Sequence, residues 1–131
     1  MDNKQTMVGC QFFLHANTLD FNAITKKLAV LPTEVTHKSE IKISELAEDY
    51  WSYNIPMEPC DDISEPIQRL IEVFIDKADI LLEILRDADI KIGMNILIDI
   101  YNDERPLMLI TGEQMSFFGK LHCPFAFDIL S

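Results

Sequence analysis

The chain has 131 residues, 48% of them hydrophobic, and a formal net charge of −11. This length suits a single domain over residues 1–131, with a core that needs no disulfide or metal to stabilise it. The excess of acid disfavours direct contact with nucleic acid or with an anionic membrane, because phosphate groups are bound by clustered Lys and Arg.

The N-terminal part of the chain predicts a strand, a helix and a second strand. Apolar residues alternate with other residues over Val8–Ala16, the pattern of a strand with one buried face. A short helix follows over Leu19–Val30, with Asp20 as its N-cap. The irregular connection after it holds a candidate edge strand at Ile41–Ile43, and alternation resumes at Tyr50–Ile55.

Prolines and acidic residues follow the second predicted strand. We expect Pro56 and Pro59 to end this strand, since proline cannot donate a hydrogen bond to a neighbouring strand. Asp61 and Asp62 are typical of a helix start, where carboxylates accept hydrogen bonds from free backbone N–H groups. The helix that they introduce has an apolar stripe at helical spacing, made of Ile63, Ile67, Leu70, Ile71 and Phe74.

The second half of the chain predicts another helix and then the longest strand. Asp76 and Asp79 resemble a helix cap, and apolar residues repeat along one face from Ala78 to Ala88. Residues Ile90–Tyr101 alternate between an all-apolar face and a mostly polar one. Such alternation is typical of a sheet that helices cover on one side only.

The C-terminal part predicts a helix between two apolar segments. Leu107–Ile110 is a candidate strand, and Thr111 with Gln114 has the pattern of a capping box for the helix that follows. Pro124 opens the last strand, which is expected to turn three side chains inward: Phe125, Phe127 and Ile129.

This order of elements predicts an α+β fold. We expect a two-layer sandwich, with one sheet of four or five strands and helices mainly on one face. A ferredoxin-like plait with a helix pair inserted after the second strand is one arrangement of these elements.

In the order and spacing of these pieces the chain resembles a bacterial family known as domain of unknown function 4279. The resemblance rests on "LDFNAITKKLAVLPTEV", the aromatic strand "YWSY", the leucine-rich helix pair, the long strand after it and the final strand "FAFDIL". It covers nearly the whole chain. The family implies a fold but no activity.

Acidic residues gather between Ile43 and Gln68, a stretch without any Lys, Arg or His. Helix capping accounts for those at its C-terminal end. A solvated face that keeps the protein soluble explains the rest, and so does a docking patch for a basic partner. The candidate partner-binding residues of this patch are Glu45, Glu48, Asp49 and Glu58.

The sheet face without helices is the second candidate surface. It is either an ordinary solvated face or a recognition surface, since tyrosine, amide and acidic side chains on a rigid sheet suit contact with a basic protein. The candidate residues there are Tyr50, Asn95, Asp99 and Tyr101.

No pattern in the sequence predicts catalysis. The chain has no glycine-rich phosphate loop and no nucleophile elbow. The spacing of Cys10, Cys60 and Cys123 relative to the histidines predicts no metal site, and we expect no cofactor. Three scattered cysteines and no hydrophobic signal region favour reduced thiols in the cytoplasm.

Three functions remain open. The first is a small non-enzymatic binding protein, most simply an immunity protein that neutralises a basic toxin domain such as a nuclease by direct contact. The second is a small-molecule-binding domain or enzyme that uses the polar sheet face, with His15 or Asp99 as the anchor. The third is a structural or regulatory module that acts by forming a homodimer.

Overall fold

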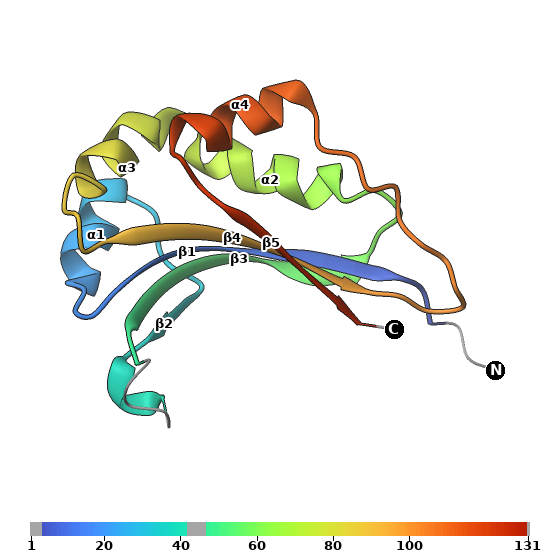
Figure 1. Ribbon diagram of the computed structural model, residues 1–131, viewed down its shortest axis with the longest axis horizontal. Coiled ribbons are helices and arrows are strands. Elements are labelled where there is room, and N and C mark those ends of the chain that lie inside the picture. Colours follow the sequence, from blue (N-terminus) through green and yellow to red (C-terminus); the bar gives the residue numbers. More distant parts are fainter. Residues whose placement is uncertain (1–3, 42–46, 131) are drawn as a thin grey trace.

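The computed structural model describes residues 4–41 and 47–130, and its centre is a five-stranded sheet in the order β2-β3-β1-β4-β5 (Figure 1). The central strand β1 is antiparallel to β3 and β4, β2 is antiparallel to β3, and β5 is parallel to β4. The strands are β1 Met7–Ala16, β2 Glu34–Thr36, β3 Asp49–Pro59, β4 Lys91–Asp99 and β5 Phe125–Leu130.

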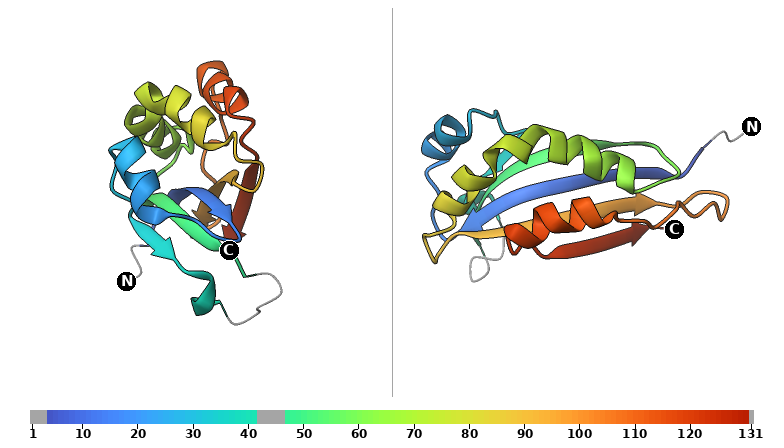
Figure 2. Two further views of the ribbon diagram at one scale, coloured as in Figure 1. Left: turned by 90° about the vertical axis from the view of Figure 1, so that its left-hand side faces the viewer. Right: turned by 90° about the horizontal axis from the view of Figure 1, so that it is seen from above.

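All α-helices lie on the same face of this sheet (Figures 1 and 2). The predicted two-layer α+β sandwich is therefore confirmed. Two short 3₁₀ helices accompany the α-helices: η1 lies between β2 and β3, and η3 joins α2 to α3. The helices are α1 Phe21–Leu28, η1 Lys38–Glu40, α2 Ser64–Phe74, η3 Ile75–Lys77, α3 Ala78–Ile84 and α4 Gly112–Lys120.

The first four strands have the order and directions of the ferredoxin-like plait, with the helix pair α2 and α3 after β3, and β5 is added at the edge. In such a plait, strands joined through a helix are parallel and separated by another strand. Helix α1 joins β1 to β2 across β3, and α2 with α3 joins β3 to β4 across β1, as in the plait. Only the last unit departs from it, because β4 and β5, joined through α4, are direct neighbours. The sandwich is built around a central antiparallel strand with one parallel strand added at the edge.

The core lies between the sheet and the helices. Alternate residues of β1 and β4 are buried beneath them, as the alternation predicts, and Ile96 is 0% exposed. Trp51 of β3 is also 0% exposed, and its Nε1 donates a hydrogen bond to Thr25 Oγ1 at 3.0 Å. The ring of Phe74 from α2 packs against Phe12 at 4.9 Å between centroids, which ties the helix layer to the middle of the sheet.

Strand β3 is longer than predicted because a bulge accommodates its first proline. Val8 pairs with Glu58 and Cys10 with Ile55, so Pro56 and Met57 together oppose Gly9. Beyond Ser52, β3 has no neighbour on its β2 side within the described residues, so this half of β3 is an edge strand. Edges and bulges are the positions in a sheet where proline is tolerated.

Other boundaries shift for local reasons. Helix α1 has the predicted N-cap at Asp20 but ends at Leu28, because Ala29 adopts a left-handed conformation with φ of 54°. The edge strand is Glu34–Thr36, and Ile41 is not in a strand. Residues 42 and 43 of the predicted edge strand lie outside the described residues.

The helix starts and the C-terminal segments agree with the sequence only in part. The capping box of Thr111 and Gln114 is present at α4. Helix α3 has no side-chain cap, contrary to the cap expected from Asp76 and Asp79. Leu107 makes only an isolated bridge with Asp62, so Leu107–Ile110 is not a strand.

The first testable prediction concerns the orientation of β4. Replacing Ile96 with Ala removes a fully buried side chain and should lower the free energy of unfolding by about 2–5 kcal/mol. Leu97→Ala, on the opposite face of the same strand, is the matched control and should cost clearly less. Urea denaturation of both variants tests this, and a loss under about 1 kcal/mol for Ile96→Ala would contradict the assignment.

The second prediction concerns the bulge. A Cβ at Gly9 would lie 2.8 Å from the Ile55 carbonyl oxygen and 3.0 Å from the Met57 nitrogen, both of them backbone atoms. Gly9→Ala should therefore destabilise the protein by roughly 1–3 kcal/mol, the usual cost of overpacking. Gly119→Ala is the control, because a Cβ there meets nothing within 4 Å and alanine favours a helix. Equal melting temperatures for the two variants would count against the bulge.

Candidate functional site

The sheet face opposite the α-helices is called the outer face below. No α-helix covers it within the described residues, and η1 lies on its side of the sheet beside β2 (Figure 1). Strand register places alternate side chains of every strand on this face. These are Gln11, Phe13 and His15 of β1, Glu34 and Thr36 of β2, Tyr50, Ser52 and Asn54 of β3, Lys91, Asn95, Leu97 and Asp99 of β4, and Ala126, Asp128 and Leu130 of β5.

Three rings form a cluster on the outer face. His15 stacks on Tyr50 with centroids 5.3 Å apart and an interplanar angle of 14°. Phe13 lies 5.7 Å from His15 and 5.9 Å from Tyr50. A Cβ on Gly93 would come within 2.5 Å of the Phe13 ring, so this ring lies directly over the glycine. The cross-strand packing gives the outer face a rigid aromatic cluster at the end of the sheet where β1 ends and β3 begins.

Polar groups follow the aromatic cluster along the outer face, with Gln11 and Asn95 beside it and Asp99 at the other end of the sheet. Asn95 Nδ2 donates to Gln11 Oε1 at 3.4 Å, and Tyr101 Oη donates to Asp99 Oδ2 at 2.9 Å. The buried Oδ1 of Asn54 has no hydrogen-bond partner within the described part of the chain. A shallow depression of about 250 Å³ opens between these groups, lined by Gln11, Phe13, Glu34, Thr36, Ile41, Tyr50, Ser52 and Asn95.

The charges of the outer face and its rim are mostly negative. Glu34, Asp99 and Asp128 come from β2, β4 and β5, so they span the sheet from edge to edge. Glu48 Oε1 lies 3.0 Å from His15 Nδ1 at the rim. Lys91 is the cation that register places on this face, and its Nζ donates to the Ala88 carbonyl. The outer face is therefore suited to a positively charged partner.

Asp49 is not available to a partner, which corrects the sequence prediction. It is only 1% exposed, and its carboxylate accepts hydrogen bonds from Leu19 N at 2.9 Å and Lys38 N at 2.8 Å. Burial acts to raise the pKa of Asp49, but the two backbone hydrogen bonds outweigh it, and the pKa is lowered from its usual value of 3.8. The Asp49 carboxylate therefore links the start of β3 to two other segments, the residues just before α1 and the start of η1.

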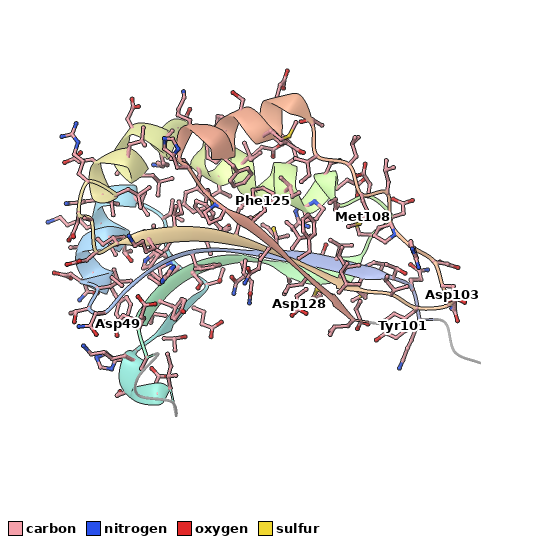
Figure 3. The ribbon with its side chains drawn as sticks, viewed as in Figure 1. Asp49, Tyr101, Asp103, Met108, Phe125 and Asp128 are labelled. Atoms are coloured by element: carbon pink, nitrogen blue, oxygen red, sulfur yellow. The ribbon has the colours of Figure 1, made fainter. Side chains whose placement is uncertain are left out.

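The other acids of the Ile43–Gln68 stretch do not form one patch. Glu58 lies near the far end of β3, where the bulge turns its side chain to the helix side and Arg69 Nη1 binds it at 3.0 Å. Glu48 precedes the other end of the strand, about 30 Å away at the usual rise per residue. Figure 3 shows the same separation for Asp49 and Tyr101, which lie at opposite ends of the sheet. Glu45 lies outside the described residues.

The structure thus brings together only part of the predicted set. Tyr50, Asn95 and Asp99 share the outer face, but Tyr50 lies at one end of it and Asp99, with its hydrogen-bonded Tyr101, lies at the other. The sequence interpretation missed Glu34 and Thr36, because it assigned the edge strand to a later segment. The alternation in "EVT", directly after Pro32-Thr33, was the signal that could have found them.

The cysteines are poor nucleophiles. Burial raises the pKa of the Cys10 and Cys123 thiols to about 12, and burial also raises the pKa of Cys60. Cys60 lines a cavity of about 440 Å³ at one end of the sheet, together with Lys4, Gln5, Thr6, Pro59, Asp61, Glu65, Glu104, Arg105 and Pro106. A thiol without thiolate character does not attack an electrophile at neutral pH, so this cavity has no evident nucleophile.

Two further findings concern residues 4–41 and 47–130. No three His, Cys, Asp or Glu side chains there are arranged to hold a metal ion. None of the helices in these ranges is long and apolar enough to cross a membrane.

The third prediction concerns Asp49. Asp49→Ala leaves the buried N–H groups of Leu19 and Lys38 without acceptors and should lower the free energy of unfolding by about 2–4 kcal/mol at pH 7. The folded-state pKa lies below the unfolded value, so this stabilisation is fully present above the unfolded pKa and is lost as pH falls through the folded one. The gap between wild type and variant should therefore narrow below pH ~4. Urea denaturation at pH 7 and pH 3 measures the difference in free energy of unfolding between wild type and variant. An equal difference at both pH values would contradict the stabilising role of the Asp49 carboxylate.

Comparison with known proteins gives one match, to a family. No curated protein matches the chain, and no solved structure matches it. One family model does match, described as a domain of unknown function (DUF4279), and the match spans residues 4–131. Since this range is essentially the whole chain, the protein belongs to the DUF4279 family.

Proposed function

We propose that this protein is a non-enzymatic binding protein that holds a basic protein partner on its outer face and acts as an immunity protein. The partner would be a toxin domain, such as a nuclease, that is neutralised by direct contact. The single observation behind the proposal is the composition of the outer face. An aromatic cluster at one end of the face is followed by amides, and acids extend from β2 to β5.

The physical properties of this face favour a protein partner. Tyrosine supplies a large contact area at a low entropic cost, and a well-ordered sheet needs little reorganisation on binding. Acidic rim residues accelerate encounter with a basic surface and repel an acidic one. An acidic face can also fill the phosphate-binding cleft of a nuclease, which is necessarily basic.

An immunity protein needs neither a nucleophile nor a metal, and the high pKa of the thiols is consistent with this role. The natural location is the cytoplasm, where a toxin that cuts nucleic acid acts. Free thiols at Cys10, Cys60 and Cys123 suit that reducing compartment.

A second candidate function is small-molecule binding in the depression beside Tyr50. Its lining of aromatic, hydroxyl and amide side chains, among them Phe13, Thr36 and Asn95, favours it. The volume disfavours it, because about 250 Å³ in an open depression is below the ~300–1,000 Å³ of typical ligand pockets. His15 is also engaged with Glu48 and is not a free anchor. We therefore rank protein binding first.

The fourth prediction separates the outer face from overall charge. The triple variant Glu34→Lys, Asp99→Lys, Asp128→Lys should associate with the basic partner at least ~10-fold more slowly at low salt, with a flatter salt dependence. Its control is Glu72→Lys, Asp79→Lys, Glu83→Lys on α2 and α3, which changes the net charge equally on the opposite face. Each surface change should alter stability by no more than about 0.5 kcal/mol.

The partner is the basic protein that the wild-type chain captures from its native host. Association rates by surface plasmon resonance at two salt concentrations test the surface. Rescue of cells that express this partner alone tests immunity. Equal slowing by both triple variants would show that only net charge matters, and a partner that does not harm cells would disprove immunity.

A further inference from the structure

The free edge of β5 is the most unusual surface outside the outer face. Within the sheet β5 has one neighbour, β4. Met94 N donates to the Pro124 carbonyl at 3.1 Å, and Ile100 N donates to the Leu130 carbonyl at 2.8 Å. Because hydrogen-bonding direction alternates along a strand, the even-numbered residues face β4. The backbone N–H and C=O groups of Phe125, Phe127 and Ile129 therefore point to the open edge.

This edge has none of the usual features that block strand addition. Natural edge strands are shortened, bulged or protected by Lys and Pro. The opposite edge follows this rule, since β2 has only three residues, one of them Glu34. Strand β5 has six residues without Lys or Pro, and its one charge, Asp128, lies on the outer face.

The helix side of β5 is apolar and only half covered. Phe118 of α4 packs on Phe125 with centroids 4.8 Å apart, at the start of the strand. Phe127 and Ile129 were expected to be inside, and register does place them on the helix side with Ile96 and Ile98. They are nevertheless 45% and 53% exposed, because α4 does not extend over this half of β5 (Figure 2).

We propose that a second copy of this chain pairs with β5 in antiparallel fashion, so that the two sheets become continuous. A two-fold axis perpendicular to the sheet keeps helix-side residues opposite helix-side residues. The register that uses all three free residues puts Phe127 opposite Phe127 and Phe125 opposite Ile129. Each of these pairs exchanges two backbone hydrogen bonds. Asp128 then lies opposite Ala126, which avoids contact between like charges.

The surface is self-complementary, which favours a second copy over an unrelated strand. In this register the exposed Ile129 of one copy meets Phe125 of the other, which already lies under its own α4. Phe125 of each copy thus packs against the otherwise exposed Ile129 of the other copy. A groove of about 330 Å³ beside α4, lined in part by Met115, Gly119 and Phe125, lies at the start of β5, where this register brings Ile129 of the other copy.

The size of this surface suits a dimer. Met115, Phe127, Ile129 and Leu130 are 57%, 45%, 53% and 55% exposed. Side chains of this size leave on the order of 400 Å² of apolar area for burial. A standard interface buries ~800 Å² per partner, of which roughly 60% is apolar. Pairing within the plane of the sheet leaves the outer face open, so this inference does not depend on the proposed function.

The fifth prediction tests the dimer and its register on the full chain. Sedimentation equilibrium at micromolar to ~100 µM concentration should give a dimer mass. In a Cys60→Ser, Cys123→Ser background, Phe127→Cys should form a disulfide-linked dimer on mild oxidation, because paired Cα atoms lie about 5.5 Å apart. Asp128→Cys is the matched control and should not form a disulfide-linked dimer. In the proposed register its two Cα atoms lie roughly 8 Å apart, beyond the ~7 Å that a disulfide can span.

Two variants separate loss of pairing from loss of folding. Gly119→Trp places a large ring where a Cβ meets nothing within 4 Å in one copy, and should give a monomer mass while the variant keeps a cooperative thermal transition. Phe127→Lys adds an edge lysine and should raise the dimer dissociation constant at least ~10-fold. A monomer mass for the wild type at every concentration would overturn the proposal, even if β5 binds an unrelated strand. Cross-linking of Asp128→Cys as fast as Phe127→Cys would also overturn it.

Discussion

The antiparallel pairing of β1 with both β3 and β4 is the interaction on which the rest of the molecule depends. It places a strand of strict alternation at the centre of the sheet, so every second residue enters the core and the residues between them reach the outer face. The helices pack on the apolar side through Phe12 and Phe74. The aromatic cluster of Phe13, His15 and Tyr50 forms on the other side as a direct result of the same register.

Two local devices adapt this sheet to its connections. The bulge opposite Gly9 reverses the side-chain alternation of β3, so Glu58 faces Arg69 on the helix side instead of the outer face. At the other end, the buried carboxylate of Asp49 holds two loops through backbone N–H groups. Acids that are close in the sequence therefore serve different purposes. Asp49 is structural, Glu58 pairs with Arg69 of α2, and Glu48 orients His15.

Features that depend on neighbouring residues could be predicted from the sequence. The cap at Asp20, the capping box of Thr111 and Gln114, and the alternation of β1 and β4 all follow from contacts within a few residues. Predictions failed where a distant segment decides. Pro56 is tolerated because the bulge opposes Gly9, and Phe127 is exposed because α4 ends short of it. The burial of Asp49 depends on Leu19, thirty residues away, which no local pattern reveals.

The alternation of β1 also separates two kinds of evolutionary constraint. Phe12 and Leu14 must fit the core, whereas the outward side chains must fit the partner of the outer face; these are Gln11, Phe13 and His15. Neighbouring codons of one strand are therefore under different selection. Substitutions at the outward positions leave packing intact and alter only the contact surface. A scaffold of this kind can acquire a new partner through a few changes on one face, without first regaining lost stability.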